Sequence, residues 1–300
     1  MKGIVYTVWI LLILMSCEHK NDKGNILAVE SAPSNVPIAF KEHLCPEHML
    51  IHRVVFSPDL SELYFTLSDS AFTNFDVYVS EVVNGNYTNP QKAFFNSDYN
   101  EHGMSFSPDG KTLYFSSTRP TNVESIPDTW HIWKTERVGD TWTKPVFVDI
   151  PNMRDKLLSH PSISKDGVLY FHASNVDYSN MSIYSVQIST PFGNAKPLHL
   201  LGDKSIGTCT PYVAPNNDFL IFASIGQQLD LWINFKDKDG QWTKSKKLNE
   251  NINKFGQGNP YITPDQKYLF YATGSNDQPW NIKWVKIELD KIQGVKSPKK

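Results

Sequence analysis

One phrase recurs five times along the 300-residue chain and constrains its fold more than any other feature. The clearest copy reads SFSPDGKTLYFSS, and looser copies read FSPDLSELYFTLS, ISKDGVLYFHAS, VAPNNDFLIFAS and ITPDQKYLFYAT. The copies align on five register positions, which are Phe56, Phe106, Ile163, Val213 and Ile262. The steps between these positions are 50, 57, 50 and 49 residues. A period of this size indicates a repeat architecture.

The local chemistry of each copy predicts a β-hairpin. In the clearest copy Pro108 presets φ for a turn, Asp109 bonds to nearby backbone, and Gly110 accepts a positive φ. The residues on both sides of the turn are strand formers. A second hairpin follows, and in three units its turn carries a glycine, an aromatic residue and a threonine, at 85–88, 139–143 and 240–243. Each unit therefore reads as four short strands.

These units predict an all-β fold. The strands are short and alternate with period two, and no segment after residue 25 has a convincing helical period. Four-stranded units of about 40 to 50 residues match the blades of a β-propeller. We therefore expect five four-stranded blades.

The last unit lacks a fourth strand, because the chain becomes polar soon after residues 284–287. The segment at 35–40 resembles the strand at 89–96 in the next unit, so it is suited to complete the last blade. Closure by this N-terminal strand would pair two open edges and predicts a seam between residues 35–41 and 281–289. The alternative is a loose N-terminal linker and a ring that closes in another way.

The first 17 residues have the pattern of an export signal. Lys2 precedes an apolar run at 4–15 that is too short to span a bilayer. The following Ser16-Cys17 completes a segment that resembles the lipobox of bacterial lipoproteins, in which the peptide is cut before a cysteine that then carries lipid. The alternative is an ordinary signal peptide with an incidental cysteine.

The resulting domain prediction has four parts. A lipoprotein signal peptide at 1–17 ends in lipidated Cys17, a flexible tether occupies 18–34, the propeller occupies 35–290, and a polar tail occupies 291–300. We expect the protein in the cell envelope, anchored by lipid to the outer membrane, on its periplasmic face or at the cell surface. The lipid would be its only contact with the membrane.

Charge and cysteine usage limit the partners and cofactors. The net charge is −2, which does not favour binding to nucleic acid. Cys45 and Cys209 fall in units one and four, which do not adjoin in a ring of five, so a disulfide between them is the less favoured state. No spacing of cysteine and histidine indicates zinc, and we expect no cofactor.

The repeated phrase resembles the WD40-like PD40 repeat of TolB-type β-propellers. The resemblance covers about residues 35–290, with the full motif in SFSPDGKTLYFSS. It implies the propeller architecture but not a function, because propellers carry their function in loops grafted on the blades. The extra N-terminal domain of TolB has no counterpart in this sequence.

The segments that lead into the innermost strands of a propeller ring one mouth of its central channel. In this chain they are polar in all five units, and histidine occurs in three. The candidate binding residues of this funnel are His52, Arg53, Glu101, His102, His160, Thr208, Thr210 and Asn259. One interpretation is a funnel that binds a small or extended ligand. The other is a solvated rim whose side chains satisfy backbone groups.

The loops that follow the second strand of each unit are a further candidate surface. The longest, at 119–128, accounts for the 57-residue step and contributes Arg119 and Asp128 as candidate binding residues. A surface insertion without function is the alternative. Aromatic residues of these loops would stack on sugars, anchor a partner, or seal the blades; they are Phe72, Phe75, Trp130 and Trp280.

Two functions remain open from the sequence. The first is a binding or assembly module for a glycan, a peptide or an envelope protein. The second is a carbohydrate-active hydrolase or lyase centred on Glu101, His102 and His160, which a second carboxylate facing Glu101 or a cluster of three histidines in the funnel would favour. We assign no catalytic residue and no metal site, because the histidines come from different units and no nucleophile or phosphate motif is present.

Overall fold

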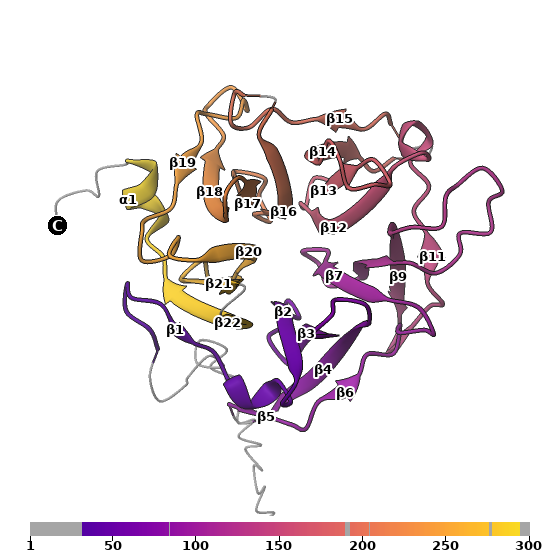
Figure 1. Ribbon diagram of the computed structural model, residues 1–300, viewed down its shortest axis with the longest axis horizontal. Coiled ribbons are helices and arrows are strands. Elements are labelled where there is room, and N and C mark those ends of the chain that lie inside the picture. Colours follow the sequence, from indigo (N-terminus) through magenta and orange to yellow (C-terminus); the bar gives the residue numbers. More distant parts are fainter. Residues whose placement is uncertain (1–31, 84, 190–192, 204, 276–277, 295–300) are drawn as a thin grey trace, which may run out of the picture.

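The computed structural model describes residues 32–83, 85–189, 193–203, 205–275 and 278–294. Five antiparallel sheets are arranged around a central axis as the blades of a β-propeller (Figure 1). This confirms the predicted all-β fold with five blades. The predicted signal peptide, Cys17 and most of the tether lie outside the described residues.

The first strand of each blade lies nearest the axis and the later strands follow outward (Figure 1). Blade 1 contains β2 (Met49–Phe56), β3 (Glu62–Asp69), β4 (Phe75–Val83), β5 (Asn86–Tyr87) and β6 (Gln91–Lys92). Blade 2 contains β7 (Glu101–Phe106), β8 (Thr112–Ser117), β9 (His131–Val138), β10 (Thr141–Trp142) and β11 (Val146–Phe147). Blade 3 contains β12 (Leu157–Ile163), β13 (Val168–Ser174), β14 (Ser182–Gln187) and β15 (Lys196–Pro197). Blade 4 contains β16 (Gly207–Val213), β17 (Phe219–Ile225), β18 (Leu229–Phe235) and β19 (Lys246–Lys247). Blade 5 contains β20 (Gly256–Ile262), β21 (Tyr268–Ser275), β22 (Gln278–Lys286) and β1 (Ile38–Ala39).

The repeated turns form as their residues predict. Gly110 takes a φ of 71°, and the Asp109 carboxylate accepts hydrogen bonds from the Ser107 hydroxyl at 2.6 Å and the Lys111 N–H at 3.1 Å. The Ser107 hydrogen bond is the main cause that lowers the pKa of Asp109. The aspartates of the phrase therefore hold turns. In blades 1 and 2 the second hairpin also forms, and the outermost strand is divided into two short segments.

The N-terminal strand closes the ring as predicted. β1 pairs antiparallel with β22, with Ile38 opposite Trp284 and Ala39 opposite Lys283. Beyond the strand, the N–H of Phe40 donates to the carbonyl of Ile282 at 2.9 Å. The Phe40 ring is buried and lies within 6.5 Å of four aromatic rings, those of Phe56, Tyr87, Phe270 and Trp284. The seam is thus both hydrogen-bonded and packed.

The sequence did not predict three short helical turns. They are the 3₁₀ helices at Glu42–Leu44 and Pro151–Met153 and the helix α1 at Leu289–Gln293. Each is too short to show a helical period. Among the described residues, no helix is long and apolar enough to cross a membrane. Cys45 and Cys209 are free thiols, so the disfavoured disulfide is absent from the described part of the chain.

An irregularity in the innermost strands positions the channel residues. Gly103, His160, Thr210 and Asn259 stand three residues before the register positions of their blades, and all four have a φ between 47° and 63°. Each of these strands shifts register against its neighbour at this point. The equivalent residue of blade 1, Arg53, does not take a positive φ, although β2 also has a bulge there. The backbone of blade 1 therefore differs at this position from that of the other four blades.

Candidate functional site

A hollow of about 570 Å³ lies between blades 1, 2 and 3 at the end of the channel where the innermost strands begin. We call it the histidine hollow. It is lined by Phe72, Thr73, Phe75, Asn100, His102, Thr118, Asp128, Thr129, Trp130, Leu157, Ser159, His160, His172, Tyr178 and Met181. The hollow is thus lined both by the first residues of the innermost strands β7 and β12 and by the loops that follow the second strands of blades 1, 2 and 3.

Three imidazoles form the floor of the hollow. The ring centroids of His102 and His160 are 4.4 Å apart, and those of His160 and His172 are 4.8 Å apart. The hydroxyl of Ser159 lies 3.0 Å from His102 Nε2 and 3.1 Å from His160 Nδ1, and it donates to the hydroxyl of Ser116. Ser116 also accepts a hydrogen bond from the N–H of His160 at 2.9 Å. These contacts fix the imidazoles in place, with His160 in a left-handed backbone conformation.

His172 was not among the residues predicted from the sequence. This residue lies on β13, where the other blades carry small side chains, namely Thr66, Ser116, Ala223 and Ala272. A large polar residue at a position that is small in the other four blades could have marked His172 as a candidate from the sequence. The backbone N–H of Thr210 donates to His172 Nδ1 at 3.3 Å, which requires that nitrogen to be unprotonated.

The imidazoles of the channel are neutral at pH 7. Burial lowers the pKa of His172 to about 3 and that of His52 to about 4. Burial also places the pKa values of His102 and His160 well below the ordinary value, and the charges of neighbouring groups, including Arg53, add to this effect. The hollow therefore offers imidazole nitrogens as hydrogen-bonding groups without positive charge.

Aromatic side chains form the wall of the hollow. The Trp130 ring lies edge-on to His102 with centroids 4.0 Å apart, and Phe75 contacts both rings at 5.8 and 5.6 Å. Phe72 and Tyr178 at the rim are 47% and 59% exposed. Both rings therefore present apolar surface to solvent beside the hollow. Three of the predicted aromatic loop residues thus lie at the site, while Trp280 packs against His52 at 6.3 Å.

Glu101 and Arg119 are placed away from the hollow. Glu101 is fully buried, and its carboxylate accepts hydrogen bonds from Arg119 Nη2 at 2.8 Å and from the Ser97 and Ser117 hydroxyls. Arg119 also donates to the carbonyl of Phe95 at 2.6 Å. This buried pair holds the base of the long loop. Asp128 is the one carboxylate among the residues that line the hollow, so the hollow does not hold the carboxylate pair centred on Glu101 that the enzyme hypothesis considered.

The remaining predicted residues serve the backbone or lie elsewhere. Thr208 Oγ1 accepts from the N–H of Ile183 at 3.1 Å, and Thr210 Oγ1 accepts from the N–H of Asn259 at 3.3 Å. These bonds join blade 4 to its two neighbours, and both threonines are buried and not solvated. His52 Nε2 is hydrogen-bonded to the Ser68 hydroxyl at 2.7 Å. Arg53 reaches a separate cavity at the other end of the channel.

Within the described ranges, no group of three or more histidine, cysteine, aspartate or glutamate side chains is arranged to hold a metal ion. The His102, His160 and His172 rings instead pack against one another. Their arrangement suits contact with an uncharged polar ligand.

Comparison with known proteins identifies the fold and no family. No protein-family model matches the chain, and no curated protein matches it, so the likeness to PD40 repeats stays a prediction. A solved structure described as a glycoside hydrolase has a TM-score of 0.55 at 9% identity, over 84% of this chain and 90% of that one. A protein of unknown function from Dyadobacter fermentans DSM 18053 has a TM-score of 0.52 at 12% identity, over 84% and 82%. At such identities the likeness shows the propeller fold alone.

Proposed function

We propose that the chain is a binding module of the cell envelope whose histidine hollow takes a neutral saccharide. The main support for this proposal is that flat apolar rings and uncharged polar groups line the same hollow. Sugar rings present apolar faces and a rim of hydroxyls, so they need both kinds of contact. Trp130 and Phe75 supply the faces, and Asn100 and the imidazoles supply hydrogen-bonding groups.

A binding role has more support than catalysis at this site. Hydrolysis of a glycosidic bond by the usual mechanism requires two carboxyl groups on either side of the bond. Asp128 has no carboxylate partner among the residues that line the hollow, and Glu101 is ion-paired with Arg119 below it. The funnel proposed from the sequence is retained in a narrower form, centred on His102, His160, His172 and Trp130.

Replacing Trp130 with alanine should abolish most of the saccharide affinity. A central tryptophan in a contact surface commonly contributes enough that its loss weakens binding by about tenfold or more. The measurement is a thermal-shift screen of neutral oligosaccharides, followed by calorimetry with those that raise the melting temperature of the full chain. Trp142→Ala is the control, because Trp142 stacks on Phe94 at the outer edge of blade 2, away from the hollow.

Two outcomes would contradict this proposal. One is that no neutral saccharide stabilises the protein, and the other is equal affinity in the Trp130→Ala and unsubstituted chains. Release of shortened sugars from a bound saccharide would instead support the hydrolase or lyase alternative.

We also propose that lipid on Cys17 holds this module in the envelope, on the evidence of the sequence around it. Cells that express the chain should incorporate labelled palmitate into it, and Cys17→Ser should remove the label completely. Cys45→Ser is the matched control and should keep the label. Export with cleavage at another position and no lipid would contradict the anchor.

A further inference from the structure

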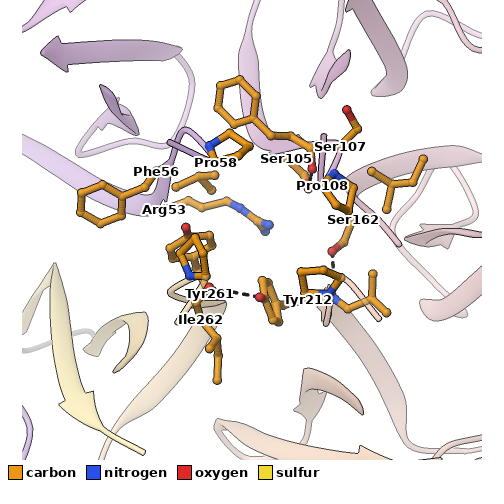
Figure 2. Close-up of a pocket in the computed structure, with 16 residues that line it drawn as sticks. Arg53, Phe56, Pro58, Ser105, Ser107, Pro108, Ser162, Tyr212, Tyr261 and Ile262 are labelled. Carbon is orange, nitrogen blue, oxygen red and sulfur yellow. Dashed lines mark hydrogen bonds between the residues drawn. The ribbon is translucent and has the colours of Figure 1, made fainter. Parts of the chain in front are cut away.

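A second cavity, of about 140 Å³, lies at the end of the channel where the innermost strands finish. We call it the arginine cavity. All five blades contribute to it, and its rim includes four prolines of the repeated turns, which are Pro58, Pro108, Pro215 and Pro264. Figure 2 shows the side chain of Arg53 extending into its centre, with Tyr212 and Tyr261 on one side and Ser105 on the other.

Arg53 has an unusual environment for a cation. The residue is 1% exposed, and its Nε and Nη1 atoms are buried without a hydrogen-bond partner in the described part of the chain. Burial lowers the pKa of the guanidinium to about 10, so it remains charged at pH 7. A buried charge without a partner is costly to the folded state. Nε and Nη1 lie on different edges of the planar guanidinium, so an incoming carboxylate would pair with the edge formed by Nη1 and Nη2, of which Nη1 is without a partner among the described residues.

Two of the neighbouring hydroxyls already donate to the protein, and a third accepts a hydrogen bond from it. Tyr212 donates to the carbonyl of Ile262 at 3.1 Å, and the Ser162 hydroxyl accepts from the N–H of Val213 at 2.9 Å (Figure 2). The Ser107 hydroxyl donates to Asp109 in its own turn. Arg53 is therefore the charged donor in the cavity that lacks a partner within the described ranges. Because its charge is positive, the ligand that it would bind is an anion.

The shape and lining of the cavity restrict the anion. A guanidinium fork matches the two oxygens of a carboxylate, whereas phosphate or sulfate has further oxygens that need donors. The walls around Arg53 are largely apolar, with Phe56, Phe106 and the rim prolines. An apolar cavity of about 150 Å³ is large enough to hold a benzene ring. The ligand should therefore pair one carboxylate with a compact apolar group.

We propose that the arginine cavity binds a monocarboxylate bearing a compact apolar group, either a free acid or the C-terminal residue of a peptide. This site is separate from the histidine hollow and independent of the proposed saccharide function. Its ligand is held by one charged fork at the channel axis and by apolar contact with the turns.

The test is calorimetric titration of the full chain with benzoate, isovalerate and a tripeptide ending in leucine, at constant ionic strength. Binding of the first two alone would indicate a free acid, and preference for the tripeptide would indicate a peptide terminus. Benzamide, isovaleramide and the amidated tripeptide are the matched neutral probes and should not bind. Arg53→Met should weaken carboxylate binding by about 10-fold to 100-fold, the range expected for a hydrogen bond to a charged group.

A variant of Arg53 could lose binding because it misfolds or because it lacks the guanidinium, and two measurements distinguish these causes. Arg53→Met removes an unpaired buried charge, so the ligand-free variant should melt at the same temperature as the unsubstituted chain or higher. Arg53→Lys keeps the charge without the fork and should bind more weakly than the unsubstituted chain. The proposal is overturned if carboxylates and their amides bind alike, if Arg53→Met binds carboxylates unchanged, or if inorganic phosphate binds and carboxylates do not.

Discussion

Acidification from pH 7 to about pH 4.5 should destabilise the protein steeply, because three buried histidines must stay neutral in the folded state. His102, His160 and His172 have pKa values lowered mainly by burial, to about 3 for His172. In the unfolded chain each would titrate near about pH 6.5. Above that pH neither state binds the proton, and below it only the unfolded state does. The free energy of unfolding should then fall by about 1.4 kcal/mol per pH unit for each histidine, or about 4 kcal/mol per unit for these three. His52, whose pKa burial lowers to about 4, should add to the slope in the same direction.

Urea unfolding at a series of pH values measures this slope. His172→Ala, which installs the residue found at this position in blades 4 and 5, should make the slope shallower by about 1.4 kcal/mol per pH unit. His43→Ala is the control, since His43 is exposed and should leave the slope unchanged. The turn aspartates with lowered pKa values, such as Asp109, titrate below this window and do not obscure it. An identical slope in His172→Ala would contradict the prediction.

Phe40→Ala should cost about 3–5 kcal/mol of folding free energy, the range for truncating a buried phenylalanine. The cost is large because Phe40 fills the junction between the first and last blades, within 4.9 Å of the Phe270 ring and 5.6 Å of the Trp284 ring. Loosening β1 would also expose the edge of β22, which invites association between chains.

Denaturant unfolding and light scattering measure both effects. Phe94→Ala is the control, because Phe94 is about half exposed on the outer side of the ring. A ring that closes independently of the N-terminal strand would lose no more stability from Phe40→Ala than from Phe94→Ala.

The fold could be predicted from the sequence because its determinants are local and repeated. The Ser107-Pro-Asp109-Gly110 turn satisfies its own hydrogen bonds within five residues. The same bond from a hydroxyl to an aspartate recurs in blades 1, 3 and 5, while blade 4 keeps the proline but has alanine and asparagine in their places. The seam was predictable for a related reason: a missing strand at one end of the chain had a matching segment at the other.

The site could be predicted only in part, because it depends on where side chains point and what they meet. Arg53 and His160 share a repeat position, yet the bulge with positive φ places His160 in the histidine hollow while Arg53 reaches the opposite cavity. The sequence pattern places Glu101 on the rim of the channel, but it does not show the ion pair with Arg119, 18 residues away, that buries its carboxylate. His172 was overlooked because it stands inside the repeated phrase that had been assigned to structure.

The direction of β1 determines which end of the ring receives whatever precedes it. Ser34 accepts a hydrogen bond from the N–H of Lys286, at the end of β22 nearest the arginine cavity, and the chain then runs antiparallel to β22. A chain immobilised ahead of Ser34 is therefore joined to the rim opposite the histidine hollow. Sensor surfaces and affinity beads coupled at the N-terminus should leave that hollow facing the solution, whereas the arginine cavity would face the support.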